Sequence, residues 1–96
     1  MTTIKGQKFL TVYAEANDIY EIEYVKKPTY GLNILNDTDG DIQISIDGDF
    51  ASNADETAGL YITLPSGAAA NDLAVPFSTI YIKSAAAGNI VIERCG

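Results

Sequence analysis

Apolar and polar side chains alternate residue by residue along several short stretches of this chain. In residues 20–24 a large apolar side chain occupies every second position with glutamates between, and in residues 42–46 three isoleucines alternate with a glutamine and a serine. Successive side chains of a β-strand point to opposite faces, whereas a helix repeats about every 3.6 residues. The alternation therefore predicts strands that each bury one face.

The same reasoning predicts about seven short strands along the whole chain. They are expected at residues 9–14, 20–24, 30–35, 42–46, 60–64, 79–83 and 89–93. Turns separate them, formed by asparagine and aspartate at residues 17–18 and containing glycine or proline elsewhere, and the small, polar stretches 51–58 and 66–72 are expected to be loops. The pattern indicates an all-β fold, a single antiparallel β-sandwich of the jelly-roll or Ig-like kind, that forms one domain over residues 1–96.

The alternation also predicts which side chains form the core. A one-residue slip in pairing would turn every apolar side chain of a strand toward solvent, so these side chains must point inward together. The expected core consists of Tyr20, Ile22, Tyr24, Ile42, Ile44, Ile46, Ile62, Ile80, Ile82, Ile90 and Ile92.

Charge is distributed unevenly along the sequence. The net charge is −7, and residues 28–82 contain eight acidic side chains but no lysine or arginine. Nucleic-acid binding needs clustered basic residues that displace counterions from phosphates, so no nucleic-acid partner is expected. No apolar run approaches the roughly 20 residues that span a bilayer, and the N-terminus is too polar for a signal peptide. We therefore expect no membrane partner and no secretion.

Three closely spaced aspartates raise the question of a calcium site. Asp37, Asp39 and Asp41 have the spacing of the first ligands in an EF-hand loop. Such a loop also needs glycine at its sixth position and glutamate at its twelfth, where this chain has Ile42 and Gly48. We predict no metal site, and keep these three aspartates as an incomplete candidate calcium loop.

Turn formation explains the aspartates better than metal binding does. Asp41 and Asp47 flank a predicted strand, which separates them by about 20 Å at ~3.3 Å per residue, too far to share one ion. Asp39 and Asp47 are each followed by glycine. Because Asp-Gly pairs readily supply the positive φ of tight turns, positive φ is expected at both Gly40 and Gly48.

The sequence contains no recognisable catalytic motif. There is no histidine, which removes the commonest general base and metal ligand. Ser66 lies before a glycine but lacks the first glycine of a nucleophile elbow and a base. Cys95 is the only cysteine, so no internal disulfide can form, and no histidine can activate its thiol. We expect no catalytic residues, no cofactor and no enzymatic activity.

Four segments follow one another in a recognisable order. They are a strand ending in Asn-Asp-Thr (residues 32–38), Ile-Gln-Ile-Ser-Ile-Asp-Gly (42–48), a Leu-Pro-Ser-Gly turn (61–68) and a closing hairpin that begins Ile-Tyr-Ile-Lys (80–93). This order resembles small β-sandwich proteins encoded in the virion gene clusters of tailed bacteriophages. The resemblance covers about two-thirds of the chain and leaves out residues 1–30.

The resemblance implies a structural role on a phage particle. We expect a head decoration or auxiliary capsid protein that is made in the bacterial host cytoplasm, is located in the virion and binds the capsid or other virion proteins. The alternative is a neck, tail or fibre component, structural or binding a carbohydrate or receptor. A homo-oligomer is expected, first a trimer, because capsid lattice sites commonly lie on three-fold axes. The side chains expected to face the particle are Lys5, Lys8, Lys26 and Lys27.

Overall fold

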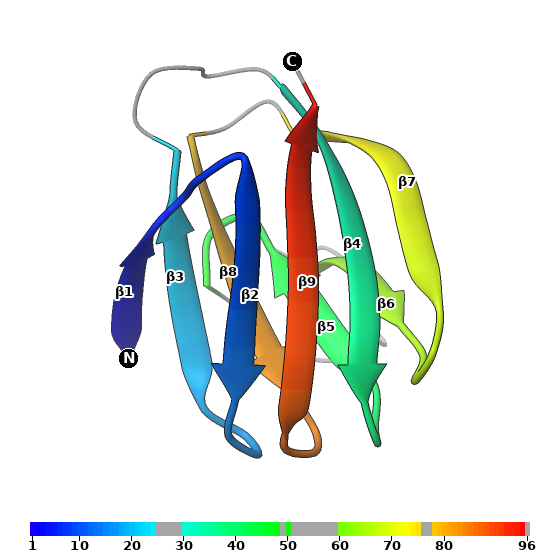
Figure 1. The fold of residues 1–96 in the computed structure, drawn as a ribbon. Helices are drawn as coiled ribbons and strands as arrows, with labels where there is room; N and C mark the ends of the chain where they lie inside the picture. The colour runs from blue at the N-terminus through cyan, green and yellow to red at the C-terminus, as the bar shows by residue number, and fades with distance from the viewer. Residues whose placement is uncertain (25–29, 49, 51–59, 76–77, 96) are drawn as a thin grey trace.

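A computed structural model describes residues 1–24, 30–48, 50, 60–75 and 78–95, and all regular structure within them is β-strand. The nine strands are β1 (Thr2–Lys5), β2 (Phe9–Ala14), β3 (Ile19–Glu23), β4 (Tyr30–Thr38), β5 (Ile42–Ser45), β6 (Leu60–Leu64), β7 (Ala69–Val75), β8 (Thr79–Ser84) and β9 (Gly88–Cys95). They form two sheets packed face to face (Figure 1). The expected all-β sandwich is confirmed. No helix that could cross a membrane occurs in the described residues.

Each sheet combines strands from distant parts of the chain. Sheet A has the order β1-β3-β8-β5-β6, and sheet B has the order β2-β9-β4-β7. Antiparallel pairs join β2 to β9, β3 to β8, β4 to β7 and β5 to β6. This nesting of early with late strands is the connectivity of a jelly roll, to which β1 adds a strand parallel to β3. Of the two sandwich types expected, the strand order matches the jelly roll.

Two strands, β1 and β7, were not predicted by the alternation. β1 contains a single large apolar residue, and β7 overlaps residues 66–72, for which a loop was wrongly expected. In β7 the pairing register with β4 shifts between Leu32 and Ile34, and Asp72 has a φ of 59°. The backbone N–H of Asp72 donates to the Asn33 side chain at 2.8 Å. This bulge interrupts the period of two, which is why the sequence pattern does not reveal the strand.

The side chains between the sheets agree closely with the expected core. All of the expected residues are buried except Ile46 and Ile62, which are half-buried. The core contains five further side chains that the alternation did not single out: Val12, Ala14, Leu32, Ile34 and Leu64.

The buried Asn36 links the β4–β5 turn to the β6–β7 turn. Both turns lie toward the lower end of the molecule in Figure 1. The Asn36 amide group donates to the carbonyl oxygens of Gly40 at 2.8 Å and Leu64 at 2.9 Å, and its oxygen accepts from the backbone N–H of Thr38 at 3.0 Å. Ser66 donates its hydroxyl to the carbonyl of Thr38. These bonds hold the β4–β5 and β6–β7 turns together.

Positive φ was predicted at Gly40 and Gly48, and the prediction is confirmed at Gly48 only. Gly48 has a φ of 86°, but Gly40 does not adopt a positive φ. The turn at Gly40 is instead held by side chains, since its carbonyl accepts from Asn36 and its N–H donates to the Thr38 hydroxyl at 3.3 Å. A Cβ at Gly40 would lie 3.2 Å from that of Ala86, so glycine there permits close packing against the β8–β9 turn.

Candidate functional site

The outer face of sheet B carries four exposed large apolar side chains. Phe9 and Tyr13 in β2 are 67% and 61% exposed, Leu35 in β4 is 41% exposed, and Val91 in β9 is 39% exposed. Val91 is paired with Thr11 of β2 on one side and with Leu35 on the other. Diagonal neighbours across paired strands lie within reach of aromatic side chains, so Phe9 and Tyr13 flank this row. We name Phe9, Tyr13, Leu35 and Val91 the apolar face.

Polar groups border the apolar face. Asn33 donates to the Glu93 carboxylate at 3.2 Å, and Asp37 is paired with Asn89 farther along the same strands. The Lys8 ammonium lies 5.8 Å from the centre of the Phe9 ring. A hollow of about 130 Å³ opens here, lined by Asn33, Ile34, Leu35, Ala69, Asn71, Val91 and Glu93. An apolar centre within a polar rim is the usual composition of a protein–protein contact.

The outer face of sheet A is polar, and Glu21, Glu23 and Lys5 on it have partners. Glu21 accepts from the Thr3 hydroxyl at 2.7 Å and from the Tyr81 hydroxyl at 3.0 Å. The hydrogen bond to Glu21 raises the pKa of Tyr81. Lys5 and Glu23 form an ion pair at 3.6 Å. The two outer faces of the sandwich therefore differ in chemistry.

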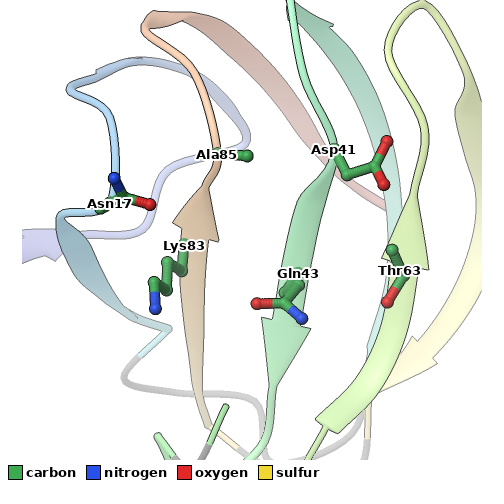
Figure 2. A pocket seen from close by; sticks show the side chains of 6 residues that line it. All are labelled: Asn17, Asp41, Gln43, Thr63, Lys83 and Ala85. Atoms are coloured by element: carbon green, nitrogen blue, oxygen red, sulfur yellow. The ribbon is translucent and has the colours of Figure 1, made fainter. Parts of the chain in front are cut away.

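A shallow pocket of about 260 Å³ opens on sheet A near the turns at one end (Figure 2). It is lined by Asn17, Asp41, Gln43, Thr63, Lys83 and Ala85. Lys83, Gln43 and Thr63 come from adjacent strands β8, β5 and β6 and are directly opposed in the pairing register. They form the floor of the pocket.

Two turns position the remaining lining residues. The backbone N–H of Asn17, which has a φ of 66°, donates to the carbonyl of Ser84 at 2.7 Å. The N–H of Ala85 donates to the carbonyl of Asp41 at 2.9 Å. The pocket thus combines amide, carboxylate, hydroxyl and ammonium groups, which can hydrogen-bond a hydroxyl-rich ligand. None of the described residues that line it is aromatic, so these residues would not stack on a bound sugar.

The aspartates of the candidate calcium loop lie on different faces. Asp37 lies in β4 on the outer face of sheet B, Asp39 in the following turn, and Asp41 in the pocket on sheet A. Within the described ranges, no three acidic, cysteine or histidine side chains are grouped so that they could hold a metal ion. The lack of a micromolar calcium site stays a prediction. Calorimetric titration would contradict it by detecting stoichiometric binding that Asp39→Ala abolishes.

Tyrosines, whose rings can stack on sugars, have separate positions in this fold. Tyr20 and Tyr24 are buried in the core, Tyr13 belongs to the apolar face, and Tyr81 lies on the outer face of sheet A. Ser66, considered as a nucleophile, instead hydrogen-bonds the β4–β5 turn. These positions bring together no catalytic set.

The apolar face was not predicted from the alternation, although the sequence contains a signal for it. Apolar residues occupy consecutive positions in three strands of sheet B, as in Phe9 with Leu10, Ile34 with Leu35, and residues 90–92. Such runs place apolar side chains on both faces of a strand. They indicate that sheet B has a second apolar face in addition to the core.

Comparison with known proteins does not assign a family, because no protein-family model and no curated protein matches the chain. The features that bear on function are therefore the apolar face, the polar pocket and the sequence resemblance.

Proposed function

We propose that this chain is a non-enzymatic structural protein of a tailed-phage virion, a head decoration protein that docks on the capsid lattice through the apolar face. The observation that carries the proposal is the exposure of four large apolar side chains on a regular sheet. Clustered exposed apolar groups with a polar rim mark protein-binding surfaces. The sequence resemblance supplies the class of partner.

The charges fit docking in one orientation. Lys8 lies beside Phe9 at the border of the apolar face, where it can approach a capsid carboxylate. Lys5, which we expected to face the particle, lies in β1 and pairs with Glu23 on sheet A. Lys26 and Lys27 lie outside the described residues. In this orientation sheet A, with its polar face and pocket, points away from the particle.

Imaging of virions tests the proposal. Particles of the phage that encodes the chain are purified, and the protein is located by gold-labelled antibody and by its ratio to the capsid protein. We expect labelling over the head. A label confined to the neck or a tail fibre would refute the head assignment, and absence from particles would refute a virion role.

Variants then test the docking surface itself. Leu35→Lys and Val91→Lys each place a charge in the apolar face, and we expect folded proteins that no longer bind purified particles stripped of the chain. Ala87→Lys is the matched control, because Ala87 is exposed in the β8–β9 turn. If both apolar-face variants bind the particles as well as the wild type does, the apolar face is not the docking surface.

The polar pocket favours a second candidate function, binding of a carbohydrate receptor. Its carboxylate, amides and hydroxyl are the groups that bind sugar hydroxyls in proteins. A glycan array, read with and without calcium, tests this function. Binding that is lost in Gln43→Ala and kept in Leu35→Lys would support it, and an array without signal would remove it.

A further inference from the structure

The sandwich has four edge strands, and they differ in how well another strand could pair with them. β1 has only four residues. The register of β6 shifts against β5 between Ile44 and Ser45, and that of β7 shifts against β4. Short edges and bulges both hinder pairing with a further strand. β2 instead keeps an unbroken register with β9 over all six residues, Phe9–Ala14.

The backbone of β2 presents hydrogen-bonding groups along this edge. The N–H of Arg94 donates to the carbonyl of Lys8 at 2.8 Å, which fixes the phase of the β2–β9 ladder. Along a strand, successive residues direct their backbone N–H and C=O groups alternately toward and away from a given neighbouring strand. Lys8 directs these groups toward β9, so Phe9, Thr11 and Tyr13 direct theirs away from it. Within the described residues, no backbone bond outside the sheets uses these groups. The same three residues direct their side chains to the outer face, where they are exposed.

We propose that β2 pairs with β2 of a second copy of this chain, antiparallel, about a two-fold axis at Thr11. In this register Phe9 of each copy lies opposite Tyr13 of the other, and the two Thr11 residues lie opposite each other. Aromatic and threonine pairs are among the favourable cross-strand pairs. Each opposed pair exchanges both backbone hydrogen bonds, so sheet B continues across the axis.

The charges of β2 select the antiparallel arrangement. Lys8 precedes the strand and Glu15 follows it. Antiparallel pairing brings Lys8 of one copy near Glu15 of the other, whereas parallel pairing would bring like charges together at both ends. This complementarity identifies the occupant of the edge as a second copy. A strand from another virion protein and the expected trimer are the alternatives that the experiments separate.

The first experiment measures association of the isolated protein by sedimentation. The net charge of −7 on each chain opposes association, so the measurement is made at about 0.15 M salt, where charges beyond about 8 Å are screened. Wild-type protein from about 1 μM to about 1 mM is expected to pass from monomer to dimer, a range that covers weak dimers. A monomer throughout, or a trimer, would overturn the proposal.

Two variants at Thr11 test the edge. Thr11→Pro removes an N–H that the β2–β9 ladder does not use, so the fold is expected to remain while pairing across the axis is lost. Thr11→Lys places two ammonium groups, one from each copy, opposite each other at the two-fold axis. It replaces Thr11→Pro as the test variant if the proline variant does not fold. Either folded variant is expected to weaken the dimer at least about tenfold. Leu35→Lys is the control and should dimerise like the wild type.

A cross-link tests the register. Opposed residues in a hydrogen-bonded antiparallel pair have Cα atoms about 5.5 Å apart, within the roughly 4.4–6.8 Å that a disulfide bridges. In a Cys95→Ser background, Thr11→Cys is expected to form a covalent dimer on oxidation, and Thr63→Cys on sheet A is not. A dimer that Thr11→Cys does not cross-link would overturn the register. These experiments use no particles, so their outcome is independent of the proposed docking on a capsid.

Discussion

At the scale of single residues, Asn36 shows how one polar side chain can determine the geometry of a whole end of the molecule. It is fully buried in a strand whose other inward positions are Leu32, Ile34 and Thr38. Its amide satisfies backbone groups in two turns that are distant in sequence. An apolar residue at this position would remove both hydrogen bonds and leave the Gly40 carbonyl to the Thr38 hydroxyl, a loss that costs more than the burial of a hydrogen-bonded amide.

We predict that Asn36→Ala lowers the free energy of unfolding by about 3 kcal/mol, because the Leu64 carbonyl and the Thr38 N–H lose their bonds to Asn36 and the Gly40 carbonyl is left to the Thr38 hydroxyl. Asn89→Ala is the matched control, since Asn89 is exposed in β9, and its effect should stay within about 0.5 kcal/mol. Chemical denaturation measures both. Equal effects of the two substitutions would show that the buried hydrogen bonds do not stabilise the turns.

Tyr24 gives the stability a dependence on high pH. Burial raises the pKa of its hydroxyl to about 12, although the Arg94 guanidinium opposes the shift. The unfolded chain ionises near pH 10, so the stabilisation is complete below that pH and is lost between pH 10 and 12. We predict a fall in unfolding free energy from pH 9.5 to 11.5 that is smaller in Tyr24→Phe. Tyr13 is exposed, so the unfolding free energy of Tyr13→Phe should fall by as much as that of the wild type.

At the scale of elements, the sequence predicts strands well where one face meets solvent and the other the core. β8 alternates cleanly, and the buried isoleucines of β5 and β8 were all identified. β7 was missed because its bulge depends on Asn33, a residue of another strand that single-sequence periodicity cannot include. The apolar face was missed for a related reason. It joins residues of β2, β4 and β9, and only the pairing register shows that they are neighbours.

The β8–β9 turn depends on a glycine. Gly88 has a φ of 154°, and a Cβ there would lie 2.7 Å from the Cα of Thr38. We predict that Gly88→Ala lowers the unfolding free energy by about 3 kcal/mol, from backbone strain and overpacking together. Gly67→Ala, with a φ of 78° but nothing within 4 Å, should cost only about 1 kcal/mol. Chemical denaturation measures both variants. If Gly88→Ala and Gly67→Ala lose similar amounts of unfolding free energy, close packing at Gly88 is not the cause of the loss.

At the scale of the whole molecule, the strand order determines how the chain reaches its fold. Phe9 pairs with Glu93 and Ile19 with Lys83, so most sheet contacts join distant parts of the sequence. Proteins dominated by such contacts fold in milliseconds to seconds. We predict refolding on that timescale, followed by tyrosine fluorescence in a stopped-flow instrument because the chain has six tyrosines and no tryptophan. Refolding within microseconds would contradict the nested topology.

The position of β9 has a consequence for synthesis of the protein. This strand lies between β2 and β4, so sheet B cannot close until residues 88–95 have left the ribosome. Until then β2 has no neighbour in its own sheet and β4 can pair only with β7, so the nascent chain exposes the kind of apolar surface to which chaperones bind. A stop codon or frameshift just before the codons of residues 88–95 would therefore remove the centre of a sheet rather than its border, and would abolish folding.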